Sequence, residues 1–134
     1  MALRPVCVDS DVLIDHLRGD ADATRRLEVL EAEGPLSTTA INAFELYYGA
    51  NKTRKREENT RAVGRLLGRL LLLDVGVRAA EKAGEVAAQL EAEGASPGFR
   101  DILIGATAVT NGCELLTRNS QHFERIPGLK LVKM

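Results

Sequence analysis

Four acidic side chains stand beside or inside apolar stretches of this 134-residue chain, where they could do chemistry. Asp9 and Asp11 directly follow a short apolar run, and Asp101 opens the almost wholly apolar stretch 101–111. Each aspartate could simply cap the helix that follows it. Glu45 is harder to explain in that way, because a lone glutamate among apolar neighbours needs a partner or a metal ion.

Carboxylates gathered in one pocket would repel one another strongly. Two unit charges about 4 Å apart repel by roughly 4 kcal/mol at an effective dielectric of about 20, and a third carboxylate adds to the repulsion. Such a group protonates or binds a cation. Oxygen ligands without a cysteine or histidine cluster favour Mg²⁺ or Mn²⁺. That ion would activate a water and stabilise charge on a phosphodiester during in-line attack.

Alternating strands and helices would have to position these acids. Helices are expected over 12–17, 23–30, 41–48, 63–70, 77–93 and 101–111. Strands are expected at 6–8, 36–38, 71–73, 113–116 and 129–132. This alternation favours a parallel α/β sheet with helices on both faces. Sites in open parallel sheets form at the carboxyl ends of the strands, so we expect Asp9, Glu45 and Asp101 to converge at that edge.

The helix over 41–48 carries an apolar stripe of Ile41, Phe44 and Tyr48, which we expect to face the core. Tyr47 could stack on bases or line a dimer face. The polar segment 51–59 predicts a solvated turn or an exposed helix start.

The composition argues against several classes of protein. Eighteen basic residues against nineteen acidic ones leave no basic excess, so nucleic acid would be handled at a local site. No apolar run reaches the roughly 20 residues that span a bilayer, and acids occupy the place of a signal peptide's apolar region. Cys7 and Cys113 lie in apolar runs without a zinc-binding spacing, which predicts two buried thiols. We therefore expect a single domain over 1–134, located in the cytoplasm and not in a membrane.

Four blocks of sequence resemble the PIN-domain ribonucleases, and in particular the VapC toxin branch of toxin–antitoxin pairs. They are VDSDVLID at 8–15, AFELYYG at 43–49, RDILIGATA at 100–108 and LLTRNSQHFERIPGL at 115–129. The resemblance implies a PIN-like three-layer α/β/α sandwich with a parallel sheet of about five strands. It also implies RNA cleavage dependent on Mg²⁺ or Mn²⁺, a homodimer, and a cognate antitoxin whose tail blocks the active groove.

Carried over by position, the resemblance makes Asp9, Glu45 and Asp101 the metal-binding and catalytic acids. Ser10 and Asp11 match the small and polar residues that follow the first acid, which would orient it and hold waters.

The TRN segment supplies the remaining candidates. Thr117 matches a supporting residue, and Asn119 stands where many relatives carry an acid, so we expect it to position a metal-bound water. Arg100 and Arg118 flank the predicted pocket and could contact RNA phosphates, although ion pairs with neighbouring acids explain them equally well. His122 is interpreted as a surface or hydrogen-bonding residue rather than a general base.

Other readings of the same residues remain open. DSDVL also fits the first motif of haloacid-dehalogenase-like phosphatases, with Asp9 as nucleophile and Asp11 as acid/base. That fold needs a lysine near the phosphate, whereas Lys130 and Lys133 fall in the last strand and tail. A receiver domain would need a lysine where Arg118 stands. A PIN-fold binding module that has lost catalysis is the third alternative, against which the intact acidic set argues.

Overall fold

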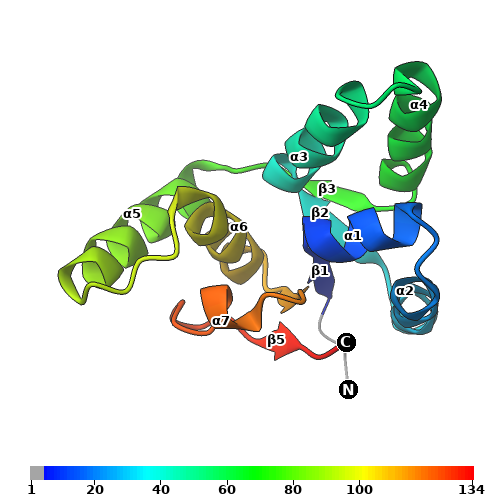
Figure 1. Cartoon of the computed structure of the whole chain (residues 1–134). Coiled ribbons are helices and arrows are strands. Elements are labelled where there is room, and N and C mark those ends of the chain that lie inside the picture. Colours follow the sequence, from blue (N-terminus) through cyan, green and yellow to red (C-terminus); the bar gives the residue numbers. More distant parts are fainter. Residues whose placement is uncertain (1–4) are drawn as a thin grey trace.

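A computed structural model describes residues 5–134 and is built around a five-stranded sheet (Figure 1). All neighbouring strands are parallel, in the order β3-β2-β1-β4-β5. The strands are β1 (Val6–Val8), β2 (Leu36–Thr39), β3 (Leu71–Leu73), β4 (Glu114–Leu116) and β5 (Leu131–Val132). The predicted parallel α/β sheet is thus confirmed, including the number of strands.

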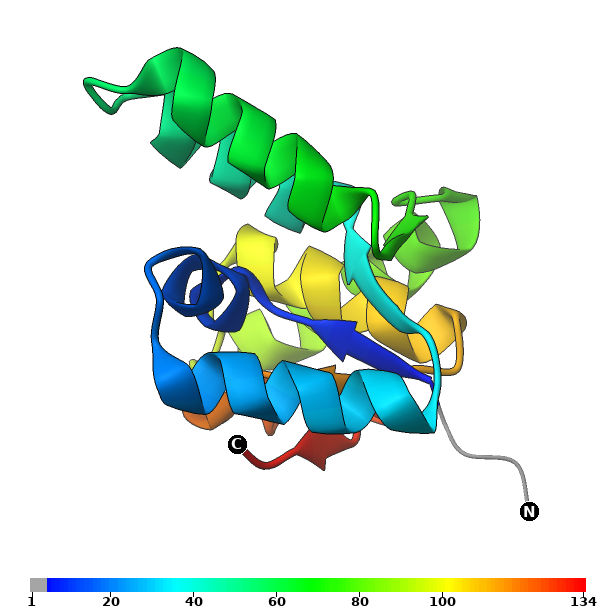
Figure 2. The same ribbon diagram turned by 90° about the vertical axis from the view of Figure 1, so that its right-hand side faces the viewer.

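Helices join the strands and cover both faces of the sheet, which makes three layers. They are α1 (Ser10–Leu17), α2 (Ala21–Glu33), α3 (Ala40–Asn51), α4 (Arg56–Leu67), α5 (Val77–Ala92), α6 (Phe99–Thr110) and α7 (Ser120–Phe123). In Figure 2, α3 and α4 lie side by side as a pair that extends beyond the sheet. The short helix α7 was not predicted, because four residues are too few to show a helical period.

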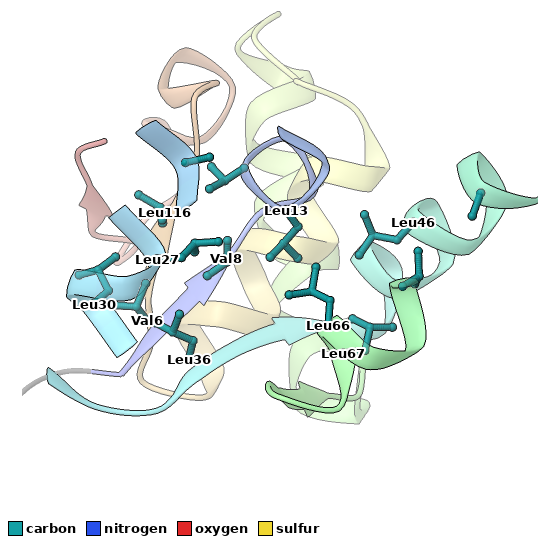
Figure 3. Packing of buried hydrophobic residues seen from close by; sticks show 14 residues of the cluster. Val6, Val8, Leu13, Leu27, Leu30, Leu36, Leu46, Leu66, Leu67 and Leu116 are labelled. Atoms are coloured by element: carbon teal, nitrogen blue, oxygen red, sulfur yellow. The ribbon is translucent and has the colours of Figure 1, made fainter. Parts of the chain in front are cut away.

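Successive residues of β1 divide the core into two clusters, as the alternation of side chains along a strand requires. Val6 and Val8 point into a cluster with residues of α1, α2, α3 and α4, part of which is seen in Figure 3. Cys7 points to the opposite face, where α5, α6 and α7 pack. Both clusters hold β1 rigidly in the centre of the sheet, so its carboxyl end is a fixed platform.

The rotation of α3 differs from the prediction. Phe44 and Tyr48 are 65% and 56% exposed, with their rings 5.9 Å apart, whereas Leu46 and Ala50 are buried against α4 and α1. The helix has apolar residues on more than one face, so the pattern alone did not identify the buried one. Ile41 of the expected stripe does pack against the core, on the side of α6.

The remaining expectations on burial are confirmed. Cys7 and Cys113 are buried free thiols. The segment 51–59 contains an exposed turn and the start of α4. No helix within residues 5–134 combines the length and the apolarity that crossing a bilayer requires.

Candidate active site

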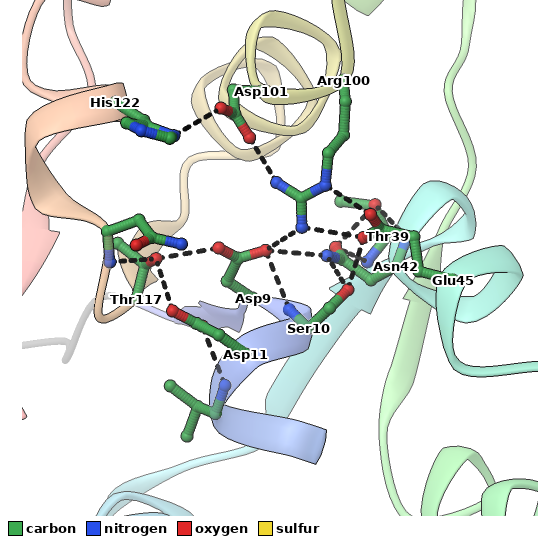
Figure 4. A network of polar contacts seen from close by, with 12 residues as sticks. Asp9, Ser10, Asp11, Thr39, Asn42, Glu45, Arg100, Asp101, Thr117 and His122 are labelled. Atoms are coloured by element: carbon green, nitrogen blue, oxygen red, sulfur yellow. Dashed lines mark hydrogen bonds and ion pairs between the residues drawn. The ribbon is translucent and has the colours of Figure 1, made fainter. Parts of the chain in front are cut away.

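The three predicted metal-binding acids meet at the carboxyl ends of the strands (Figure 4). Asp9 follows β1 and is wholly buried at the N-cap of α1, where its side chain accepts a hydrogen bond from the backbone N–H of Ser10. Glu45 comes from α3, and Asp101 lies in the first turn of α6. Capping therefore describes part of the role of Asp9. It is wrong for Asp101, because Gly98 takes the N-cap position of α6 and no side chain caps that helix.

The guanidinium of Arg100 lies among the three carboxylates. Its Nη2 donates to Oδ1 of Asp9 at 3.0 Å and to Oε1 of Glu45 at 2.8 Å, and its Nε donates to Oε2 of Glu45 at 2.5 Å. Its Nη1 donates to Oδ1 of Asp101. Burial alone would lower the pKa of Arg100, but the hydrogen bond to Glu45 and the charge of Asp9 outweigh it and raise the pKa. The side chain is therefore a permanent cation inside the acidic site.

Asp9 is held by donors from separate elements. Besides Ser10 and Arg100, Asn42 Nδ2 donates to its Oδ1 at 3.0 Å and Thr117 Oγ1 donates to its Oδ2 at 2.8 Å. A carboxylate without solvent access requires such donors, because an unpaired buried charge is strongly unfavourable. The orientation of Asp9 is consequently fixed before any ligand binds.

Asn42 is a site residue that sequence reasoning missed. Its backbone N–H donates to Thr39 Oγ1 at 3.2 Å and its Oδ1 accepts from the Thr39 backbone N–H, also at 3.2 Å, which forms a capping box at the start of α3. Its Nδ2 also donates to Ser10 Oγ at 2.8 Å, and Ser10 Oγ in turn donates to Oε1 of Glu45 at 2.6 Å. The Thr-x-x-Asn spacing ahead of an apolar helix was a signal that could have identified it.

Asp11 lies beside the acids without joining them. Its Oδ2 accepts from the backbone N–H of Arg118 at 2.8 Å and lies 3.4 Å from Thr117 Oγ1. Burial raises the pKa of Asp11, and the neighbouring charge of Asp9 raises it further. These contacts connect α1 to the segment that follows β4, so Asp11 helps to hold Thr117 in place.

Arg118 forms ion pairs with two acids outside the group of three. Its Nε lies 2.8 Å from Oδ2 of Asp15, and its Nη2 lies 3.1 Å from Oδ2 of Asp20. The ion-pair interpretation weighed for both arginines thus describes Arg118 and Arg100 in this structure.

Two further residues come from the segment after β4. Asn119 is exposed, its backbone N–H donates to Thr117 Oγ1 at 3.0 Å, and its amide group makes no hydrogen bond within residues 5–134. His122 is also exposed, but its Nδ1 lies 3.0 Å from Oδ2 of Asp101. The histidine is therefore both a surface residue and a direct partner of a site acid.

The donor set fits a hard divalent cation. The groups that meet the Arg100 guanidinium are all carboxylate oxygens, and the site has neither cysteine nor a histidine pair, which suits Mg²⁺ or Mn²⁺. One guanidinium reaches the carboxylates of Asp9, Glu45 and Asp101, so a cation in its place would meet the same oxygens. The Arg100 guanidinium lies between the three acids. In the described part of the chain, no group of three acidic, histidine or cysteine side chains is already arranged to hold a metal ion.

Comparison with known proteins agrees with this architecture. Residues 6–129 match the PIN domain family. The chain is 33% identical over 125 residues to "Ribonuclease VapC2" of Rickettsia felis, covering 92% of this chain and 93% of that protein. It is 36% identical over 93 residues to the "tRNA(fMet)-specific endonuclease VapC" of Salmonella typhimurium, covering 69% and 70%.

Solved structures give the same result. A chain in the VapBC2 structure from Rickettsia felis, bound to a promoter DNA fragment, superposes with a TM-score of 0.89. The two chains are 27% identical, and the alignment covers 97% of this chain and 98% of the other. The sequence match, the parallel sheet and the acids at its edge thus agree, and the chain belongs to the PIN-domain family, among the VapC-type ribonucleases.

Proposed function

We propose that this chain is a metal-dependent endoribonuclease and the toxin of a toxin–antitoxin pair, with residues 1–134 forming one catalytic domain. The observation that carries the proposal is the convergence of Asp9, Glu45 and Asp101 from three elements at one sheet edge in a PIN-family chain. Mg²⁺ or Mn²⁺ bound there would lower the pKa of a water and balance charge on the RNA phosphodiester.

The residues of the chain have distinct roles in this proposal. Asp9, Glu45 and Asp101 hold the cation through their carboxylate oxygens. Ser10 orients Glu45 through its 2.6 Å hydrogen bond, and Thr117 orients Asp9 through its 2.8 Å hydrogen bond. A carboxylate held in this way cannot rotate away from the cation, which keeps the reacting groups aligned.

Two more residues complete the proposed site. Asn119 has an unengaged amide at the exposed rim, where it would hydrogen-bond the attacking water or a phosphate oxygen. Asp11 supports the site from the side, by holding the segment that carries Thr117.

The partners follow from the relatives. One similar chain comes from a structure described as a toxin–antitoxin complex from Klebsiella pneumoniae, and others come from VapBC structures, which supports an antitoxin as partner. One relative is described as specific for tRNA(fMet), so tRNA is the first RNA to test. We place the toxin in the cytoplasm, as a homodimer whose active groove the antitoxin blocks.

The alternatives have less support. A phosphatase would use Asp9 as nucleophile and Asp11 as a proton donor, but both Asp11 oxygens accept hydrogen bonds and no lysine contacts either acid in the described part of the chain. A binding module without catalysis would have no need for three carboxylates whose combined charge exceeds the single positive charge of Arg100 between them.

The decisive experiment is cleavage of labelled structured RNA, including a tRNA fraction, by the purified chain with Mg²⁺ or Mn²⁺ and with EDTA. We expect metal-dependent cleavage that Asp101→Asn abolishes while circular dichroism shows an intact fold. Asp22→Asn, which removes an exposed acid paired with Arg25 on α2, is the matched control and should cleave normally. Cleavage by Asp101→Asn at the normal rate would refute the site. The absence of both cleavage and metal binding would favour the binding module.

A further inference from the structure

We propose that Arg100 is an internal counter-ion whose guanidinium takes the place of the divalent cation in the metal-free protein. The cation must therefore displace this side chain before it can reach the three carboxylates. This inference rests on the proposed metal-binding function and adds a built-in competitor to the same site.

The contacts of Arg100 are those of a substitute cation. One guanidinium uses its three nitrogens on Asp9, Glu45 and Asp101, which come from the end of β1, from α3 and from α6. Figure 4 shows the group lying between Asp101 on one side and the other two acids on the other. An arginine that only anchored α6 to a neighbour would need one of these partners, whereas this one contacts all three.

Simultaneous occupancy by the dication and the guanidinium is opposed by the repulsion between the two cations at short distance. A dication bound to these oxygens would lie within a few ångströms of the guanidinium carbon, where like charges repel strongly. Three carboxylates and one guanidinium leave a formal charge of −2, so the site still attracts a dication. Replacement of Arg100 by the ion reduces this excess to −1 and removes the repulsion. The short-range repulsion between the dication and the guanidinium, rather than the net charge, therefore favours exchange over co-binding.

Arg100 is also the group that can move. Its side chain is 37% exposed, against 0% for Asp9 and 6% for Asp101. Asn42 and Thr117 fix Asp9, and Ser10 donates to Glu45, whereas a long arginine side chain reaches solvent by rotation about its own bonds. Displacement therefore needs no change of the backbone, and it brings a guanidinium to the rim where an RNA phosphate would approach.

Metal binding measured without RNA tests the proposal. Chelator-treated protein is titrated with Mn²⁺ by calorimetry, as the natural chain, as Arg100→Ala and as Arg69→Ala. The last variant removes a more exposed arginine that pairs with Glu31 at 3.0 Å, away from the site, and it serves as the control. We expect Arg100→Ala to bind Mn²⁺ on the order of tenfold more tightly, because the competing cation is gone. Arg69→Ala should bind like the natural chain.

Thermal unfolding supplies a second measurement, in which Arg100→Ala should lower the melting temperature although it raises the affinity for Mn²⁺. Metal-free Arg100→Ala should melt at a lower temperature than the natural chain, because three carboxylates are left without a counter-ion, and Mn²⁺ should restore it. If Arg100→Ala does not fold, the side-chain Nε–H signal of Arg100 in the natural chain gives the same information by ¹⁵N NMR. We expect this signal to shift to its solvent-exposed position when Mg²⁺ saturates the site.

The outcomes separate the two proposals. Equal or weaker Mn²⁺ binding by Arg100→Ala, or an Nε–H signal that Mg²⁺ leaves unchanged at saturation, would overturn the counter-ion role and leave the metal site standing. No Mn²⁺ binding by either form would overturn both the metal site and the counter-ion role. Tighter Mn²⁺ binding by Arg100→Ala, together with no RNA cleavage by the natural chain, would support the counter-ion and contradict the nuclease.

Discussion

At the scale of single residues, the site consists of three carboxylates arranged around one guanidinium. Asp9 is buried and oriented by Asn42 and Thr117, and Glu45 is oriented by Ser10. Among these four charged side chains, Arg100 is the most exposed. A site of this kind holds its shape without metal, so metal binding and folding are separable properties of the chain.

Asn42 should matter more for stability than its uncharged side chain suggests. Asn42→Ala removes donors to Asp9 and Ser10 and breaks the capping box with Thr39, so buried partners are left unsatisfied. We expect a loss of about 1–3 kcal/mol in the free energy of unfolding, measured by urea denaturation. The control is Asn51→Ala in the same helix, whose exposed amide donates only to Tyr47 O. Equal effects of the two substitutions would contradict the role of Asn42.

Ser10 tests the orientation of Glu45. Ser10→Ala removes the 2.6 Å hydrogen bond to Glu45 Oε1 while leaving the carboxylates and their charge in place. We expect cleavage to slow by about tenfold, with a smaller change in Mn²⁺ affinity, because misplacement of a ligating group costs more in rate than in binding. The measurement is the rate of RNA cleavage at saturating Mn²⁺, with exposed Ser96→Ala as the control. An unchanged rate for Ser10→Ala would show that Glu45 does not need this contact.

At the scale of elements, the close packing of α6 places Asp101 and Arg100. A Cβ at Gly105 would lie 2.5 Å from Ile126 Cδ1 and 3.4 Å from Leu129 Cδ2, so a glycine lets the segment after α7 approach the helix. This approach holds α6 between α5 and the C-terminal segment. The first turn of α6 is thereby fixed against the end of β1.

A pair of glycine substitutions tests this packing. Gly84 occupies an exposed position of α5, where a Cβ would meet no atom within 4 Å, so Gly84→Ala should stabilise the fold by about 0.5–1 kcal/mol because alanine favours helix. Gly105→Ala should instead destabilise it by about 1–3 kcal/mol through overpacking. Adding Ile126→Val to Gly105→Ala removes the clashing methyl group and should recover part of the loss. Chemical denaturation measures all three, and a stabilising Gly105→Ala would show that Ile126 yields without cost.

At the scale of the whole molecule, two apolar clusters hold the central strand between them, and Cys7 is buried in the second one. Burial, together with the nearby Cys113, raises the pKa of the Cys7 thiol to about 12. The folded chain therefore keeps this proton at a pH where the unfolded chain releases it.

The sign of the resulting pH dependence is definite. Because the folded pKa is the higher one, the contribution of Cys7 is fully present below about pH 9 and is lost as the pH rises towards 12. We expect the free energy of unfolding to fall over the alkaline range, and to fall less steeply in Cys7→Ala. Urea denaturation from pH 8 to 10.5 gives both slopes, and equal slopes would contradict the assignment. Thiol reagents should label the chain only after it unfolds.

Much of the fold could be predicted from the sequence for physical reasons. A short apolar run such as 6–8 forms a strand, an almost wholly apolar stretch such as 101–111 forms a buried helix, and their alternation requires a parallel sheet. Parallel strands all end at the same edge, so the convergence of Asp9, Glu45 and Asp101 was also predictable. These inferences depend on chain order and local period alone.

Other features depended on how the elements pack. The rotation of α3, which buries Leu46 and exposes Phe44, is decided by its contacts with α4 and by the capping box of Asn42. The placement of Arg100 among the carboxylates depends on the angle of α6 against β1 and α3. The periodicity of apolar residues in the sequence does not predict such angles between elements, because they arise from contacts between residues far apart in the chain. The sequence alone thus determined which charges gather at the sheet edge, and only the tertiary structure decided which of them lie in contact.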